Sequence, residues 1–328
     1  MATRTDAALP SGPHLMDAAA SLQAGRTDTI LLAMLLLCGT VAAILFVLVV
    51  VFAVRYRRGS NVDRTPPRAL RGLEIWWTLT PLAIFFGIYG WAAHDYVTLA
   101  DPPPDALPVS VVAKQWMWKL QQRNGRREIN ELHVPQGEPV VLTMTSQDAI
   151  HSFFVPAFRI KQDVLPGRYT RLWFTATQLG EFPLLCSEYC GSQHSEMTGR
   201  IVVMTPADYG RWLASGAAQP SMAQYGFALF RQLGCSGCHD ARSTIHAPLL
   251  DGVYGRTVHL QDGRTVVADA NYLRDSIVVP AKDVVAGFAP VMPSFAGQVS
   301  EEDLQALIAY LQSTSQRDSP GAATWTTA

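Results

Sequence analysis

The stretch LLCSEYCGSQHSEM, Leu184 to Met197, brings two cysteines, a histidine and a methionine into one short segment of a 328-residue chain. Thiolates bind copper and zinc, imidazole binds copper, zinc, iron and nickel, and a thioether favours copper. A mononuclear blue copper site uses one Cys, two His and an axial Met. This stretch supplies the Cys, one His and the Met of that set with one extra thiolate, and two bridging thiolates can hold two copper ions side by side. The candidate ligands are Cys186, Cys190, His194 and Met197.

The second histidine of such a site comes from an earlier strand. His151, in DAIHSFFVPAF, precedes Cys186 by 35 residues and is expected at a strand end. His133 is the competitor, but its segment NELHVPQGEP is predicted to be a strand and a turn. The alternative for the loop is a Cys186–Cys190 disulfide in an exported domain. A disulfide would leave the histidine and the methionine of the loop without a role.

A second motif, GCSGCH at 234–239, contains Cys235-x-x-Cys238-His239. This spacing is the signature of covalent c-type haem attachment, in which both thiols bind the haem and the histidine is the proximal iron ligand. Cytochromes c pair that histidine with a methionine. Met292, in VMPSF, is the one methionine downstream and is the predicted sixth ligand. The rival sixth ligands are His246 and His259.

Two apolar runs near the N-terminus predict a membrane anchor. Residues 29–54 carry no charge over 26 positions, and a helix of about 20 apolar residues crosses a bilayer. The alternative is a signal sequence, whose apolar region is only about 7–15 residues and follows a basic segment. The second run, 75–93, has tryptophans near both ends, as interfacial aromatic belts do. Cys38, inside the first run, is expected to be a small buried apolar side chain.

The charge distribution sets the topology and excludes one class of partner. The segment between the two runs, 55–72, carries six Arg and one Asp, so it is predicted to stay cytoplasmic. The N-terminus and everything after His94 would then lie on the periplasmic or outer face of a bacterial inner membrane. The net charge of -1 gives no indication of a nucleic-acid partner. Residues 104–219 sum to +1 and residues 220–328 to -3, which suggests that these two parts dock on each other.

The pattern after the anchor changes from strands to helices. DPPPD at 101–105 is a stiff linker. The segments LPVSVVAKQWMWKL, PVVLTMTS, TRLWFTAT and GRIVVM are predicted strands of a β-sandwich or barrel. From Tyr225 on the patterns are helical. In SEEDLQALIAYLQS, Ser300 is a predicted N-cap with Asp303 completing the capping box, and one apolar face follows. That face consists of Leu304, Leu307, Ile308 and Leu311.

CSEYCGSQHSEM resembles the CuA loop of subunit II of haem–copper cytochrome c oxidases. HSFFVPAFRIKQDVLPGR at 151–168 resembles the family's first-histidine segment, and KQWMWKL at 114–120 its aromatic segment; the resemblance covers about residues 25–213. It implies a cupredoxin-like β domain and a binuclear copper site. The implied side-chain ligands are His151, Cys186, Cys190, His194 and Met197, with the backbone carbonyl of Glu188 as a further ligand. Leu185 departs from the polar residue often found there, which affects hydrogen bonding around the site.

The same resemblance implies three further roles. The Glu188 side chain would reach a Mg²⁺ ion shared with the catalytic subunit. Trp116 would be the surface tryptophan where electrons enter from cytochrome c; the alternative is a buried strand tryptophan. Glu74, at the cytoplasmic edge of the second run, would lie near the mouth of a proton channel of the catalytic subunit. The alternative for Glu74 is an ordinary interfacial acid.

The C-terminal part, residues 222–314, resembles a class I cytochrome c. The order of its segments implies packed N- and C-terminal helices around Tyr225–Phe230 and Tyr310, and a Pro248 carbonyl that orients His239. With the copper domain it resembles subunit II of a caa3-type oxidase. The implied function is to pass electrons from cytochrome c or another reduced donor through haem c and CuA to subunit I, where O₂ becomes water and protons are pumped.

The implied partners are subunit I of the haem a/haem a3–CuB type, subunit III, the donor and the lipid bilayer. The chain would be catalytic only inside that complex. One alternative is the copper subunit of a nitric oxide reductase. Another is a copper-delivery assembly protein, which would be a thioredoxin-like domain with one span. A quinol oxidase subunit II would lack the copper ligands.

The predicted fold class is a multidomain membrane protein with a two-helix transmembrane hairpin, an all-β cupredoxin-like domain and an all-α class I cytochrome c domain. The predicted divisions are an external segment 1–28, a first span 29–54, a cytoplasmic loop 55–72, a second span 73–94, the copper domain 104–213, a linker 214–224, the cytochrome c domain 225–314 and a disordered tail 315–328.

Overall fold

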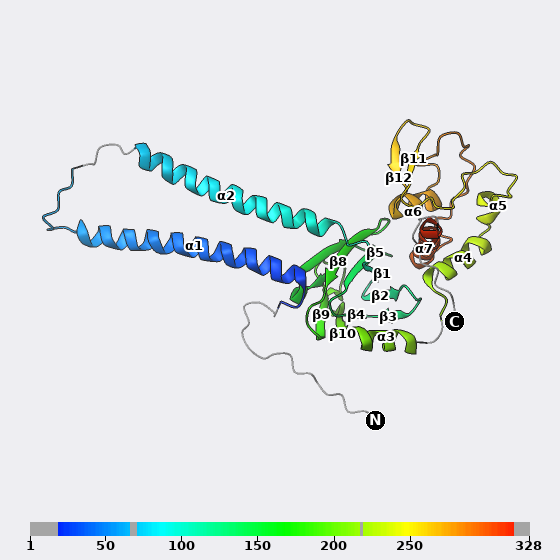
Figure 1. Cartoon of the computed structure of the whole chain (residues 1–328), viewed down its shortest axis with the longest axis horizontal. Helices are drawn as coiled ribbons and strands as arrows, with labels where there is room; N and C mark the ends of the chain where they lie inside the picture. The colour runs from blue at the N-terminus through cyan, green and yellow to red at the C-terminus, as the bar shows by residue number, and fades with distance from the viewer. Residues whose placement is uncertain (1–18, 66–70, 217–218, 318–328) are drawn as a thin grey trace, which may run out of the picture.

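The computed structural model describes residues 19–65, 71–216 and 219–317 of the chain. These residues form a long two-helix hairpin, a β domain and a mostly helical C-terminal domain (Figure 1). The predicted external segment and the predicted disordered tail fall largely outside the described residues, at 1–18 and 318–328. The three-part architecture is the predicted fold class.

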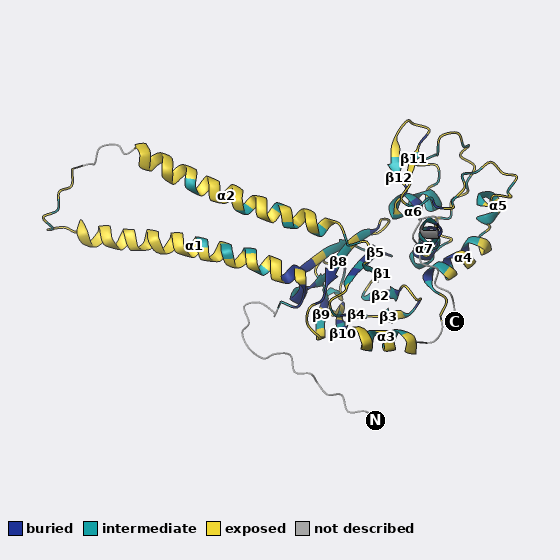
Figure 2. Cartoon of the chain, in the orientation of Figure 1, coloured by how far each residue is buried: buried dark blue, intermediate teal, exposed yellow. Residues whose placement is uncertain are grey.

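The hairpin consists of helices α1, Leu22–Arg55, and α2, Arg71–Ala100. Both are long and apolar enough to cross a membrane, with mean hydropathies of 3.1 and 1.2 over their best windows. Figure 2 shows them exposed along almost their whole length. The predicted spans are confirmed as helices and lie inside these longer bounds. Cys38 is exposed on α1, so its predicted burial is wrong: its face of the helix packs against no other part of the described chain.

Helix α1 begins seven residues before the predicted span because its first turn is fixed by the β domain. Ser21 caps the helix by accepting from the N–H of Ala24. Ala20 is fully buried and exchanges backbone hydrogen bonds with Ala157 and Thr177 of the β domain. The helix thus begins inside the predicted external segment 1–28, and residues 20–28 contact the β domain.

Two five-stranded sheets form the β domain and enclose one apolar core. The first has the order β3-β2-β1-β5-β8 and the second β4-β10-β9-β6-β7. Their pairs are antiparallel except β1 with β5 and β4 with β10. The strand bounds are β1 Leu107–Lys114, β2 Met117–Gln122, β3 Arg127–Ile129, β4 Glu131–Pro135, β5 Pro139–Ser146, β6 His151–Val155, β7 Ile160–Val164, β8 Thr170–Thr175, β9 Gly180–Cys186 and β10 Thr198–Met204.

Alternating burial along the strands builds this core, because successive side chains of a strand point to opposite faces. Strand β2 alternates at every residue, and its Trp118 is fully buried beside Phe153 with ring centroids 5.2 Å apart. The predicted strand LPVSVVAKQWMWKL is not one strand: it folds back at Gln115 and Trp116, so that β1 and β2 pair antiparallel. Two short 3-10 helices, η1 Pro156–Phe158 and η2 His194–Glu196, complete the loops.

The C-terminal domain follows helix α3, Pro206–Ser215, which closes the β domain. Its elements are α4 Met222–Gln232, α5 Ser236–His239, β11 Thr257–His259, β12 Thr265–Val267, α6 Ala270–Val278 and α7 Glu301–Arg317. The all-α prediction missed the hairpin of β11 and β12, whose strands are only three residues each and too short for a period to show. Helix α7 extends to Arg317, so the tail predicted to be disordered begins as helix.

Helices α4 and α7 cross in close contact, as the cytochrome c resemblance implied. Gly226 of α4 lies so close to α7 that a Cβ there would meet the carbonyl oxygen of Ala306 at 1.9 Å. Phe227 and Phe230 each place their ring centroid 5.3 Å from that of Tyr310. The predicted apolar face of α7 is buried, and its predicted capping box forms, because Ser300 and Asp303 bond each other's backbone N–H.

Candidate metal centres

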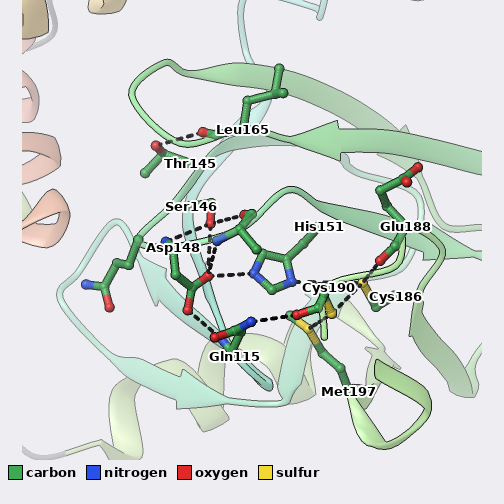
Figure 3. A network of polar contacts seen from close by, with 12 residues as sticks. Gln115, Thr145, Ser146, Asp148, His151, Leu165, Cys186, Glu188, Cys190 and Met197 are labelled. Carbon is green, nitrogen blue, oxygen red and sulfur yellow. Dashed lines mark hydrogen bonds and ion pairs between the residues drawn. The ribbon is translucent and has the colours of Figure 1, made fainter. Parts of the chain in front are cut away.

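The predicted copper ligands meet where β6, β9 and the loop after β9 converge (Figure 3). His151 is the first residue of β6, at a strand end as predicted, and Cys186 is the last residue of β9. Pairing of β6 with β9 brings them together, since Phe153 lies opposite Cys186. The Nδ1 atom of His151 is 4.0 Å from the Sγ of Cys186. His151 is fully buried, whereas Cys186 is half-buried.

The loop supplies the remaining ligands. The Sγ atoms of Cys186 and Cys190 are 3.8 Å apart. A disulfide has an S–S distance of about 2.05 Å, so the two sulfurs are free and the disulfide alternative is not what the structure contains. Cys190 Sγ is 3.4 Å from Nδ1 of His194 and 3.9 Å from Sδ of Met197. The carbonyl oxygen of Glu188 is 3.3 Å from Cys186 Sγ.

Two residues that the sequence analysis did not single out hold these ligands in place. Asp148 accepts a hydrogen bond from Nε2 of His151 at 2.8 Å, and a second one from the backbone N–H of Gln115 at 2.8 Å. The Gln115 side chain donates to the carbonyl oxygen of Cys190 at 2.7 Å. The carboxylate accepts the hydrogen bond from Nε2–H, so Nδ1 is the ring nitrogen that faces sulfur and that can bind a cation once it is deprotonated. A carboxylate three residues before a histidine is not a signal by itself, so the sequence did not identify Asp148.

The protonation of the site residues follows from burial and mutual contact. Burial acts to lower the pKa of His151, but its contacts with Cys186 and Asp148 outweigh burial and raise it. Burial opposes ionisation of Cys186, yet hydrogen bonding from His151 lowers the pKa of that thiol to about 6. Burial and the neighbouring Cys186 thiolate raise the pKa of Cys190. The sulfur pair therefore ionises unequally without a cation, and a cation between the sulfurs would favour both thiolates.

The donor set fits copper. The ligand atoms of His151, Cys186 and Cys190 all lie within 4.8 Å of one another. Nδ1 of His194 and Sδ of Met197 lie 3.4 and 3.9 Å from Cys190 Sγ, which adds a second imidazole and a thioether beside the sulfur pair. Soft sulfur with imidazole is the donor combination that copper prefers, and two cysteines can bridge two ions.

Other sequence candidates lie apart from this cluster or at its edge. His133 is held by Glu128 at 2.6 Å and stacks on Trp212, so it is not part of the copper cluster. Trp116 is half-buried beside the loop: a Cβ on Gly191 would lie 3.3 Å from its ring. Glu74 lies in the first turn of α2 and is exposed.

The second motif lies on the short helix α5, preceded by the turn at Gly234. Cys235 is its N-cap, and Cys238 and His239 are its last two residues. Nδ1 of His239 donates to the carbonyl oxygen of Pro248 at 2.8 Å, the contact that the resemblance implied. This hydrogen bond fixes the ring and leaves Nε2 as the free nitrogen.

A cavity of about 590 Å³ opens beside α5, a size typical of cofactor sites. Cys235, Cys238, His239 and Met292 all line it, and most of the other lining residues are apolar. The thiols, imidazole and thioether around an apolar cavity fit a covalently bound haem c. The rival ligands His246 and His259 also line the cavity; His246 stacks on Phe288 and His259 contacts the hydroxyl of Thr265.

Two family models match the chain, one on each domain. Residues 110–205 match "Cytochrome C oxidase subunit II, periplasmic domain", and residues 223–315 match "Cytochrome c". The first range contains all the residues of the copper cluster, and the second contains the haem-attachment motif and Met292. Each domain is thus matched separately by the family that its sequence resembles.

Similar proteins carry the name of one subunit. Cytochrome c oxidase subunit 2 of Alkalihalophilus pseudofirmus is 27% identical over 83% of this chain and 82% of its own length. Cytochrome c oxidase subunit 2 of Synechocystis is 30% identical over 63% of this chain and 77% of its own length. The crystal structure of the periplasmic domain of subunit II of cytochrome oxidase of Bradyrhizobium japonicum matches with 29% identity and a TM-score of 0.34, covering 35% of this chain and 96% of that one.

The two family models agree with the geometry of both sites and with the order of the parts along the chain. The two apolar helices precede a domain of the type described as periplasmic, which indicates a membrane-anchored protein whose metal domains lie on the outer face. The chain belongs to the family of cytochrome c oxidase subunits II and carries a cytochrome c domain fused behind the periplasmic domain of that family.

Proposed function

We propose that this chain is the subunit through which electrons enter a proton-pumping terminal oxidase that reduces O₂ to water. The observation that carries the proposal is the convergence of His151, Cys186, Cys190, His194 and Met197 in one chain with a haem-attachment motif. Copper and haem c, when bound, supply one-electron redox chemistry. Electrons would enter at the C-terminal domain from cytochrome c or another reduced donor, pass to the β domain and leave for haem in subunit I.

In this proposal the side chains of the β domain bind and orient. His151, Cys186, Cys190, His194 and Met197, with the carbonyl oxygen of Glu188, hold a binuclear CuA centre. The Asp148 carboxylate keeps the proton of His151 on Nε2, so that Nδ1 is available to copper. Burial of His151, Cys190 and Met197 excludes water from the inner side of the site.

In the C-terminal domain, Cys235 and Cys238 would attach the haem, and His239 and Met292 would bind its iron. The Pro248 carbonyl fixes the His239 ring. A His/Met pair raises the iron potential in cytochromes c, which suits a donor to copper.

Five finer assignments belong to the same proposal. The Glu188 side chain reaches Mg²⁺ at the boundary with subunit I. Trp116 is a second point where electrons enter the β domain, and its ring beside Gly191 supports this role. Glu74 lies at the mouth of a proton channel of subunit I. Both long helices cross the membrane, with residues 55–72 on the cytoplasmic side, and subunit III completes the complex.

The fold argues against the copper-delivery alternative, and the substrate distinguishes the nitric oxide reductase alternative. A thioredoxin-like copper-delivery protein does not fit a β domain of two five-stranded sheets. The nitric oxide reductase alternative would use the same two metal sites, so it is separated by the gas that the complex consumes.

The test is gas consumption by the purified membrane complex that contains this chain, supplied with reduced cytochrome c. We expect fast O₂ uptake with proton ejection and negligible NO uptake. Cys186→Ser should remove this activity together with the copper signal, whereas Cys38→Ser, a matched change on the exposed face of α1, should leave both intact. NO uptake without O₂ uptake would refute the oxidase proposal and move the chain to the reductase branch.

A further inference from the structure

The C-terminal domain is docked on the β domain through a small set of direct contacts. The Gln305 side chain of α7 reaches the carbonyl oxygens of Val111 and Thr143 on β1 and β5, at 3.5 and 3.4 Å. Glu302, one turn earlier, pairs with Lys119 at 2.8 Å and accepts from Gln147 at 2.7 Å. Figure 1 shows α7 beside the β domain. The first turns of α7 therefore lie on the sheet that contains β1.

A tyrosine of the β domain is built into the core of the other domain. Tyr169 lies in the turn between β7 and β8, yet it is only 5% exposed. It belongs to one buried apolar cluster with Leu273 of α6 and with Ile308 and Leu311 of α7. A large side chain that fills a neighbouring domain's core in this way resembles the anchor residue of a protein interface.

Asn271 fixes the backbone of this anchor. Its side-chain Oδ1 accepts from the N–H of Tyr169 at 2.7 Å, and its Nδ2 donates to the carbonyl oxygen of Tyr169 at 3.3 Å. Both backbone groups of Tyr169 are thereby paired by one side chain of α6. The Tyr169 hydroxyl, in contrast, is buried without a hydrogen-bond partner among the described residues. Packing of the ring, and not its hydroxyl, is what holds the anchor.

The anchored interface lies between the two metal sites. Leu273 and Leu311, which pack in the cluster of Tyr169, also line the cavity that contains His239 and Met292. On the other side, Gln147 bonds Glu302 and directly precedes Asp148, the residue that holds His151. The contacts that join the domains thus include residues that line the haem cavity and a neighbour of Asp148, which holds the copper ligand His151.

We propose that the C-terminal domain stays docked in the working oxidase and that Tyr169, fixed by Asn271, is the positioning residue for electron transfer between the two domains. The proposal rests on the function proposed above. The electron step itself is simple: one electron leaves the reduced haem iron and reduces the copper centre, with no bond made or broken in the protein. What the anchor controls is the separation and orientation of the donor and the acceptor.

Charge contributes less to this docking than the net charges of the two parts suggest. Among the described residues, Lys119–Glu302 is the one ion pair between the domains, and its side chains are 33% and 27% exposed. Such a pair is screened by solvent and contributes little. The buried ring of Tyr169 and the paired amide of Asn271 carry the interface.

The experiment is hydrogen exchange on the purified oxidase complex with its full-length chain. Two peptides are followed, one spanning residues 165–172 and the other 301–308, because they lie on opposite sides of the interface. In Tyr169→Ala we expect both peptides to exchange on the order of a hundredfold faster, the scale expected when a fully buried aromatic side chain is truncated. In Asn271→Ala, which leaves both backbone groups of Tyr169 without their partner, we expect both peptides to exchange on the order of ten- to a hundredfold faster. Tyr169→Phe, which keeps the ring, should match the wild type, and Lys119→Ala should change exchange less than tenfold.

A second measurement on the same samples is the rate of haem-to-copper electron transfer after rapid reduction of the haem. It should fall at least tenfold in Tyr169→Ala and stay unchanged in Tyr169→Phe, while both metal spectra are retained. Unchanged exchange in Tyr169→Ala and Asn271→Ala would refute the docking, and faster exchange with an unchanged transfer rate would refute the positioning role. If Tyr169→Ala loses its haem spectrum, the exchange and transfer rates of Asn271→Ala test the docking and the positioning role instead. Failure of the proposed function would instead appear as absent O₂ uptake by the wild-type complex.

Discussion

The contact between α4 and α7 makes one substitution a sharp test of how the cytochrome c domain is held together. Gly226 lies inside a helix with ordinary helical backbone, where Gly→Ala normally stabilises by up to about 1 kcal/mol. Here the added Cβ would lie 1.9 Å from the carbonyl oxygen of Ala306 and 2.5 Å from its carbon. Carbon atoms of side chains do not approach backbone closer than 3.0 Å, so the two helices must separate by about 1 Å.

That separation would disturb the surroundings of the haem-attachment motif, because Phe230 of α4 and Leu307 and Leu311 of α7 line a small pocket that Cys235, His239 and Met292 also line. Overpacking of a well-packed core costs about 1–3 kcal/mol. Because the clash is with backbone and cannot be relieved by a side-chain rotation, we expect Gly226→Ala to fall at the upper end of that range. For a domain of this size, each kcal/mol lowers the melting temperature by roughly 4–8 °C.

The assay is thermal unfolding of the full chain, with the haem absorbance reporting on the C-terminal domain. Gly210→Ala is the matched control, since Gly210 is also helical but is exposed and has nothing within 4 Å of its Cβ position. The control should unfold at the wild-type temperature or slightly higher. If Gly226→Ala is as stable as Gly210→Ala, the close crossing of α4 and α7 does not exist in the protein and the reasoning fails.

Three further predictions concern the sites and the pH response. Met292→Ala should keep the covalently bound haem but lose the low-spin His/Met absorption spectrum, and an unchanged spectrum would remove this residue from the ligand set. Asp148→Asn should keep every copper ligand yet weaken copper retention by about 10–100-fold, measured by titration with a chelator, because His151 loses the carboxylate that orients it; wild-type retention would contradict that role. Burial acts to raise the pKa of Asp303, but its hydrogen bonds outweigh burial and lower it below the ordinary 3.8. Its ionised form therefore stabilises the fold above that value, and stability should fall as the pH drops through the lower folded pKa; Asp303→Asn should flatten this acid limb in unfolding curves, and an unchanged slope would count against it.

The candidate sites were predictable from the sequence to the extent that their ligands are close together along the chain. Cys186, Cys190, His194 and Met197 lie within twelve residues, and Cys235, Cys238 and His239 within five. The chemistry of each donor set is visible at that spacing. His151 was found because a known kind of site requires one more imidazole from an upstream strand. Asp148 was missed because a carboxylate three residues from a histidine has no meaning until strand pairing turns that histidine toward sulfur.

The sequence alone also determined the anchor, the change from strands to helices and the capping box at Ser300, since each is encoded by local composition or period. Tertiary structure alone decided where α1 begins, because Ala20 and Ser21 are fixed by η1 and by Thr177, more than a hundred residues away. It also decided that Gly226 allows α4 to touch α7, and that Tyr169 and Asn271 join the two metal domains. These features depend on residues far apart in the chain meeting in space. Their side chains carry no local pattern, so only the packed structure reveals them.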